Sequence, residues 1–389
     1  MGRATKVPIT PAMLRWAVAE SGFAIEDVAS AADVPTRVLQ AWLAGRDRPS
    51  LTQARAVAAK LRRPLAAFLL PRVPKADAAE VQFRHPAGSD RRELNPEERN
   101  ALRDAVRLQR VVGWALREAG APAVSLPRHR VSGNAETAGA SVRRLLGLDH
   151  TSSGWRSPTE ALAGWRTSLE EVGVLVFLLP LGSASCRGFS VWDDHAPLIV
   201  ANTWFNSQAR VFTLLHELGH LVTRTSSACL DPPTPQVRGG DATERWCEEF
   251  AAAILLPRSL VEQELAERTG WRTGDRVTDL RTVSKIARSL NVSLRATALR
   301  LIKTGIANPG LYSAIPPTVD HKRGGGGGGD GRRRHEARRD QLGRRTVRIF
   351  LEAVSSGVLT TSDALEYLRV GYEDLGRLTG ATREAGEAV

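Results

Sequence analysis

Two histidines and a glutamate in the run FTLLHELGHLV (residues 212–222) have the types and spacing of a hydrolytic metal site. His216 and His220 are four residues apart, so on a helix both imidazoles lie on one face and can bind the same ion. Glu217 follows the first histidine directly, where a general base can take a proton from an activated water. The apolar neighbours predict a buried helix, in which metal ligation offsets the cost of burying polar side chains. The alternative is an ordinary helix with two surface histidines.

A third ligand is expected from a second helical run, ERWCEEFAAAILLP (residues 244–257). Glu244 and Glu248 are four residues apart on one face of this helix, so either carboxylate is a candidate. Two histidines and a carboxylate with an open fourth position form the ligand set of a catalytic zinc. Without a ligand role, Glu244 would be an acid at a helix start, where the helix dipole favours it.

The segment from Ala161 to Pro257 resembles the ImmA/IrrE family of zinc metallopeptidases. The matching pieces are RGFS (187–190), PLIVAN (197–202), ARVFTLLHELGHLV (209–222) and ERWCEEFAAAILLP (244–257). In that family the first glutamate of the last piece is the third zinc ligand, and here it is Glu244. Cys247 and Glu248 stand where the family usually has alanine and asparagine or aspartate.

This resemblance implies a zinc endopeptidase with a narrow substrate. Its zinc ligands would be His216, His220 and Glu244, and Glu217 would be the catalytic base. The protein substrate implied by the family is a DNA-bound repressor of the XRE type, rather than bulk protein.

The elements around these motifs predict an α+β, zincin-like domain. A helix over 159–172 precedes a buried strand in VGVLVFLLPL (172–181), and RGFSVWDDHAPLIVAN (187–202) predicts a β-hairpin. His195, in the hairpin turn, is either a surface residue or a group that stabilises an oxyanion. An exposed sheet edge beside the site could hold a substrate peptide by backbone pairing. The Pro- and Gly-containing stretch 226–241 predicts a lid or specificity loop.

The N-terminal part predicts short helices with tight joints. The run AIEDVASAADVPTRVLQAWLAGRDRPSLTQARAVAAKL (residues 24–61) resembles an XRE-type helix-turn-helix. The resemblance implies that residues 35–44 form a helix that enters the major groove of DNA. The implied base-reading residues are Thr36, Arg37 and Gln40, and the implied phosphate contacts are Arg46 and Arg48. The alternative is a helical module that contacts protein and no longer binds DNA.

Charge and composition point to a cytoplasmic protein with an anionic partner. The net charge is +12 and the pI is near 10.5. No apolar run approaches the roughly 20 residues that span a bilayer, so no membrane partner is expected. Three cysteines form no disulfide framework, and the first residues do not resemble a secretory leader, so we expect a reducing cytoplasm.

The sequence therefore predicts a multidomain chain. We expect an all-α helix-turn-helix domain at 1–74, a helical connector at 75–154, the zinc peptidase domain at 155–310 and a tail at 311–389. The tail combines a glycine run (324–329), an arginine-rich stretch that is either solvated or binds nucleic acid, and small helices.

The predicted function is a cytoplasmic transcriptional regulator with zinc-dependent endopeptidase activity. Two alternatives stay open: a DNA-binding regulator whose zincin domain senses a partner without proteolysis, and an antitoxin-like module. A homodimer is also possible.

Overall fold

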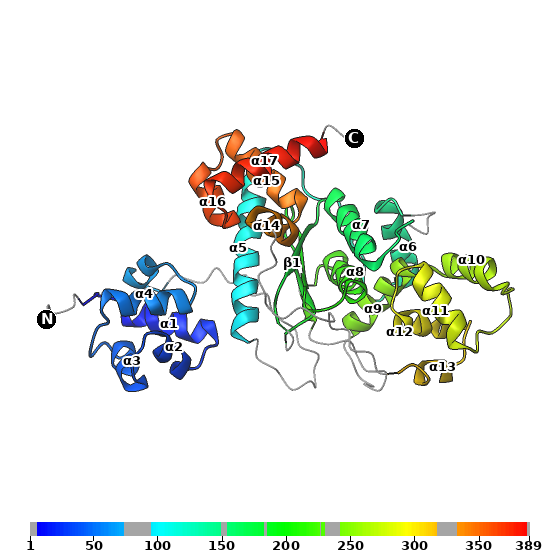
Figure 1. Ribbon diagram of the computed structural model, residues 1–389, viewed down its shortest axis with the longest axis horizontal. Coiled ribbons are helices and arrows are strands. Elements are labelled where there is room, and N and C mark those ends of the chain that lie inside the picture. The colour runs from blue at the N-terminus through cyan, green and yellow to red at the C-terminus, as the bar shows by residue number, and fades with distance from the viewer. Residues whose placement is uncertain are drawn as a thin grey trace. The chain divides into compact units, whose positions relative to one another are not determined.

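The computed structural model describes residues 6–73, 95–148, 154–182, 185–225, 227–229, 242–316 and 333–386. The chain divides into two compact units (Figure 1). One unit comprises residues 1–80 and 90–104, and the other comprises residues 81–89 and 105–389. Among the described residues, no helix is both long and apolar enough to cross a membrane.

The N-terminal unit is helical. Its elements are α1 (Pro11–Ser21), α2 (Ile25–Ala31), α3 (Thr36–Leu43), α4 (Leu51–Lys60) and the 3₁₀ helix η1 (Leu65–Leu69). Apolar side chains from these helices form one buried core, which includes Leu14, Val28, Leu39, Trp42 and Leu61.

Local sequence sets where these helices begin and end. Gly22 closes α1 and Gly45 follows α3, both with φ of 72°, a conformation that residues with a Cβ avoid. Ser50 begins α4, because its side chain accepts from Gln53 N while the Gln53 side chain accepts from Ser50 N. A helical N-terminal unit is thus present, whereas its identification as an XRE-type helix-turn-helix stays a prediction.

Helix α5 (Pro96–Glu118) begins where the Asn-Pro-Glu-Glu sequence predicts a start. Asn95 Oδ1 accepts from Glu98 N at 2.8 Å, and Glu98 Oε2 accepts from Asn95 N at 2.7 Å. Its first residues, up to Asp104, belong to the N-terminal unit and the remainder to the larger unit.

The larger unit contains a four-stranded mixed sheet with the order β1-β3-β2-β4. The strands are β1 (Leu175–Leu179), β2 (Gly188–Val191), β3 (Leu198–Asn202) and β4 (Ser227–Cys229). β1 runs parallel to β3, while β2 runs antiparallel to both β3 and β4. The predicted strand and hairpin are therefore confirmed. The edge beside β2 is taken by β4, so β2 itself is not an edge strand.

Helices of the same unit share the core of this sheet. They are α6 (Ala135–Leu145), α7 (Pro158–Glu171), α8 (Ser207–Thr223), α9 (Ala242–Leu255), α10 (Arg258–Thr269), α11 (Leu280–Ser289), α12 (Leu294–Lys303) and the short α13 (Gly310–Ser313). The sequence predicted α6 within a connector. In the structure its residues Ala138 and Val142 share the core of α9, and Arg143 donates to Ile254 O at 2.5 Å.

The C-terminal helices pack on the same unit. They are α14 (Arg334–Leu342), α15 (Arg344–Ser355), α16 (Thr361–Leu368) and α17 (Tyr372–Gly386). Arg166 of α7 donates to Asp340 O at 2.6 Å, and Glu170 accepts from Arg345 N at 3.2 Å. Part of the arginine-rich stretch is thus ordered as helix against α7. The glycine run at 324–329 and residues 230–241 of the expected lid lie outside the described residues.

Candidate metal centre

Helix α8 carries the two histidines among buried leucines and a few buried polar side chains. Asn206 starts the helix by accepting from Ala209 N, and Arg224 ends it in the left-handed conformation, with φ of 58°. Leu214, Leu215 and Leu218 are completely buried around the motif. His216, Glu217 and His220 are 6%, 0% and 1% exposed, so all three polar side chains lie inside the unit.

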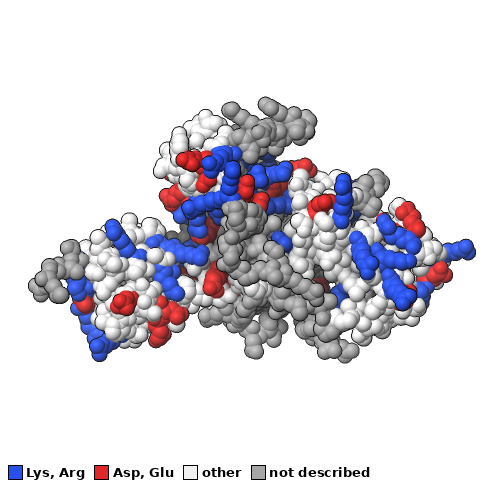
Figure 2. Space-filling model, viewed as in Figure 1, with Lys and Arg blue, Asp and Glu red and all other residues white. Residues whose placement is uncertain are grey.

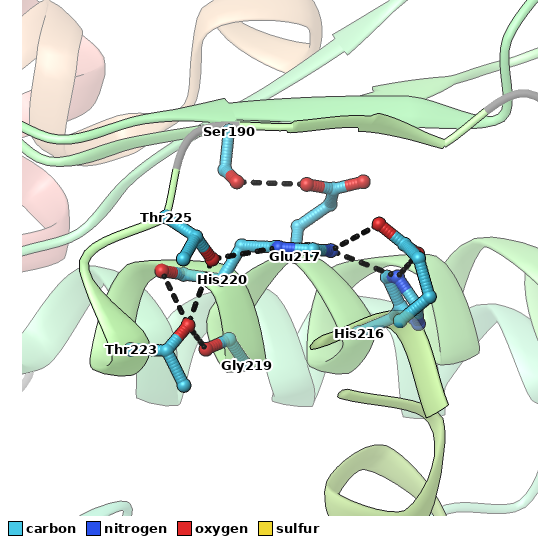
Figure 3. A network of polar contacts seen from close by, with 8 residues as sticks. Ser190, His216, Glu217, Gly219, His220, Thr223 and Thr225 are labelled. Atoms are coloured by element: carbon cyan, nitrogen blue, oxygen red, sulfur yellow. Dashed lines mark hydrogen bonds and ion pairs between the residues drawn. The ribbon is translucent and has the colours of Figure 1, made fainter. Parts of the chain in front are cut away.

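The two histidines and Glu244 converge on one point, as Figure 3 shows for the α8 residues. The Nε2 atoms of His216 and His220 are 3.1 Å apart. One carboxylate oxygen of Glu244 lies 3.1 Å from His216 Nε2, and the other lies 3.3 Å from His220 Nε2. Three potential ligand atoms therefore face a common centre.

Close packing of α9 on α8 brings Glu244 to the histidines. A Cβ added at Gly219 would lie 3.0 Å from the Cys247 sulfur and 3.2 Å from its Cα, so the glycine lets the two helices approach closely. Cys247 is fully buried at this contact. Glu244 lies one turn earlier on α9 and is therefore held beside His216 and His220.

The electrostatics of Glu244 suit a ligand. Burial raises the pKa of its carboxyl, but hydrogen bonds and charge from His216 and His220 outweigh burial and hold that pKa well below its usual range. The group is therefore a carboxylate at neutral pH, as metal ligation requires.

Glu248, the rival ligand, behaves differently. Burial, together with the charge of Glu244, raises the pKa of its carboxyl to about 7 against the opposing charge of His216. The metal-competent cluster of the described residues contains His216, His220 and Glu244, and it does not contain Glu248.

The donor set and its spacing fit zinc. Two imidazole nitrogens and a carboxylate oxygen are typical ligands of catalytic zinc, with bonds of about 2.0–2.2 Å. Three corners of a tetrahedron with such bonds are roughly 3.3–3.6 Å apart. Here the two Nε2 atoms are 3.1 Å apart, and they lie 3.1 Å and 3.3 Å from the two different oxygens of the Glu244 carboxylate. One ligand atom from each of the three residues lies within 4.8 Å of the other two. The donor types and their proximity therefore fit a zinc ion.

The hydroxyl groups of two threonines lie on the Nδ1 side of the His220 ring. His220 Nδ1 lies 3.0 Å from Thr225 Oγ1, which lies 2.8 Å from Thr223 Oγ1. Thr223 Oγ1 donates to Gly219 O at 2.9 Å. A hydrogen bond from Nδ1–H to Thr225 leaves the Nε2 lone pair directed at the centre. The sequence reading missed these threonines, although Thr225 follows the motif closely.

Glu217 points to the sheet side of α8 (Figure 3). Its Oε2 accepts from Ser190 Oγ of β2 at 2.8 Å. Ser190 was also missed as a site residue, because only the fold brings β2 against α8. The RGFS sequence gave no chemical signal of its own.

The remaining predicted residues lie elsewhere. Arg37, Gln40, Arg46 and Arg48 are exposed on α3 and the turn after it, while Thr36 is half-buried. His195 lies in the turn between β2 and β3, where its backbone N–H donates to Asp193. Neither set belongs to the cluster of described metal-competent side chains.

Two comparisons with known proteins were informative to different degrees, and one of them covers the residues of this site. No curated protein matches the chain. A family model described as the IrrE N-terminal-like domain, from a family of peptidases, matches residues 169–301. The match runs from the end of α7 through the sheet, α8 and α9 into α12, and so contains all three converging residues. In residues 169–301 the chain is therefore similar to the IrrE N-terminal-like peptidase domain, and this supports the ImmA/IrrE resemblance for that part of the sequence.

Proposed function

We propose that the larger unit is a zinc-dependent endopeptidase in which His216, His220 and Glu244 hold the ion. The observation that carries the proposal is the convergence of these three ligand atoms within 4.8 Å of one another, next to a buried glutamate that is not among them. A site that only holds a structural metal has no need of a second carboxylate that is not a ligand.

In this proposal the metal ligands and Glu217 have separate roles in the hydrolysis. The zinc ion that His216, His220 and Glu244 would hold would supply Lewis acidity toward the scissile carbonyl and toward a water molecule. Glu217 takes the proton of the attacking water and passes it to the leaving amine. Its complete burial strengthens these electrostatic interactions, because little water screens them.

The substrate we propose is a specific XRE-type repressor, as the resemblance to the ImmA/IrrE family implies. The N-terminal unit would bind DNA through α3, where Arg37 and Gln40 are exposed, and through Arg46 and Arg48 after it. A DNA-binding unit on the same chain raises the local concentration of the peptidase near a DNA-bound substrate. The chain would then act as a transcriptional regulator.

The peptidase is tested by comparing the purified wild type with Glu217→Gln, both loaded with zinc. Each protein is incubated with a proteome-derived peptide library, and new termini are identified by mass spectrometry. We expect cleavage by the wild type at a narrow set of sequences. The variant should bind one zinc per chain but cleave about 10²–10⁴ times more slowly, because an amide cannot accept the proton.

A repressor experiment then separates enzyme from sensor. The chain is expressed with an XRE-type repressor encoded beside it, and the size of the repressor is followed under derepressing conditions. Fragments with the wild type and none with Glu217→Gln are expected. An intact repressor, with equal derepression by both proteins, would show that the domain acts by binding alone.

A further inference from the structure

A serine on β2 contacts the buried glutamate directly. Ser190 Oγ donates to Glu217 Oε2 at 2.8 Å, and both side chains are 0% exposed (Figure 3). The serine comes from the sheet and the glutamate from α8, 27 residues later in the sequence. The contact therefore depends on how closely the sheet packs on the helix.

Gly188 makes this close packing possible. It lies two residues before Ser190, so both residues project to the same face of β2. A Cβ at Gly188 would lie 2.5 Å from Thr213 Cγ2 and 2.5 Å from Val200 O. It would also lie 3.6 Å from Glu217 Cγ. Only glycine fits here, and the short serine side chain then reaches the carboxylate.

A buried hydrogen bond can fix the orientation of a carboxylate group. The terminal torsion of a glutamate is broad, so the carboxyl group has no strong orientation of its own. A hydroxyl donor in a dry site forms a strong, charge-assisted bond and selects one orientation. A general base works only when one of its oxygens is within hydrogen-bond reach of the proton it removes.

We propose that Ser190 is a positioning residue for Glu217. Its hydroxyl holds the carboxylate in the orientation that meets the attacking water. The inference rests on the proposed peptidase function. It differs from a purely structural role, in which the buried hydroxyl would contribute to folding and leave turnover unchanged.

The first measurement needs no substrate. The carboxylate stretching band of Glu217 is isolated in metal-free protein as the infrared difference between wild type and Glu217→Gln. The same difference is taken in the Ser190→Ala background. Loss of a hydrogen-bond donor should shift the band. Ser355→Ala, whose hydroxyl donates to Glu352 O within α15, is the matched control and should leave the band unchanged.

The second measurement is turnover, with the peptide that the wild type cleaves fastest as a quenched-fluorescent probe. Ser190→Ala should keep one zinc per chain and the wild-type KM, while kcat falls by roughly the 10–100-fold typical of losing a hydrogen-bond partner that orients a residue in a metal site. A structural role would lower the unfolding temperature without changing kcat of the folded protein.

The outcomes separate the two proposals. An unshifted band, or a shifted band with wild-type kcat, overturns the positioning role while leaving the peptidase intact. A wild type that cleaves no peptide overturns the peptidase function. Glu217 would then not be a catalytic base, so the positioning role of Ser190 would be overturned as well. In that case a band shift would show only that the serine holds the carboxylate.

Discussion

At the residue scale, the site is a set of polar side chains that the fold buries and orients through second partners. His220 is the clearest case, because Thr225 occupies its Nδ1 and so directs Nε2 to the centre. Partners of this kind usually change metal affinity by 10–100-fold, since they fix the tautomer and the ring orientation.

Thr225→Val should therefore weaken zinc binding by about 10–100-fold. Affinity is measured by competition with a chromophoric chelator at constant pH. Thr304→Val is the control, because the hydroxyl of Thr304 contacts only carbonyls of its own helix in the described structure. Equal affinities for wild type and Thr225→Val would mean that His220 is oriented by its helix alone.

Glu248 gives a prediction about pH. In the metal-free protein, burial first and then Glu244 raise the pKa of this carboxyl from 4.5 to about 7, so folding favours its protonated form. The stability that the protonated Glu248 carboxyl gives to the folded protein is complete below pH 4.5. It is lost as the pH rises through about 7.

Glu248→Gln should remove this loss. Thermal unfolding in the presence of a chelator should show that the variant gains stability relative to wild type as the pH rises from about 4.5 to about 7, and that the difference is constant above that pH. Glu267→Gln, at an exposed carboxylate of α10, should follow the wild type. Parallel curves for wild type and Glu248→Gln would show that Glu248 ionises normally in the folded protein.

At the element scale, the decisive feature is the contact between α8 and α9. Gly219 lies between the two histidines in sequence and faces Cys247, so the same part of α8 that carries the proposed ligands also lets α9 pack closely. Helix packing and ligand geometry are thus linked.

Gly219→Ala should separate the helices and move Glu244 away from the histidines. The new methyl would meet the backbone of α9 as well as the Cys247 sulfur, so the cost cannot be relieved by rotating one side chain. We expect a loss of about 1–3 kcal/mol in unfolding free energy, together with weaker zinc binding. Chemical denaturation and metal titration measure both.

Gly376→Ala in α17 is the matched control for this substitution. Apart from its chain neighbours and the nearby backbone of its own helix, no heavy atom of the described residues lies within 4 Å of its would-be Cβ, so alanine should be neutral or stabilising there. A Gly219→Ala protein that keeps wild-type zinc affinity would show that α9 can retreat without moving Glu244.

At the scale of the whole molecule, positive charge is not confined to the N-terminal unit. Figure 2 shows Lys and Arg side chains over α11, where Arg281, Lys285 and Arg288 are exposed along one helix face. A test of DNA binding must therefore distinguish specific contacts of α3 from the general attraction of a chain with a net charge of +12.

Arg37→Ala in the full chain should weaken binding to the promoter DNA of its own gene by about 1–3 kcal/mol, if Arg37 contacts a base. Arg281→Ala removes the same charge from α11 and should reduce only the weak, non-specific binding. Fluorescence anisotropy at several salt concentrations separates the two, because phosphate contacts weaken steeply with salt. Equal losses for both variants would favour a protein-contact role for the N-terminal unit.

The sequence alone determined the local part of this protein. The spacing of His216 and His220 placed both on one helix face, and β-branched runs and turn residues predicted β1 and the β2–β3 hairpin. These features depend on residues within about one or two turns of each other, which periodicity records. Helix starts such as Asn95 were predictable for the same reason.

Tertiary structure decided what depends on distant segments. Sequence spacing left Glu244 and Glu248 equal as ligands, and the resemblance to a family favoured Glu244. Packing of α9 on α8 places the Glu244 carboxylate between the histidines. Ser190 joins Glu217 only because Gly188 lets β2 lie against α8, and α6 packs with α9 although the chain separates them widely. Side-chain contacts across long loops leave no periodic trace in a sequence, so the fold alone sets them.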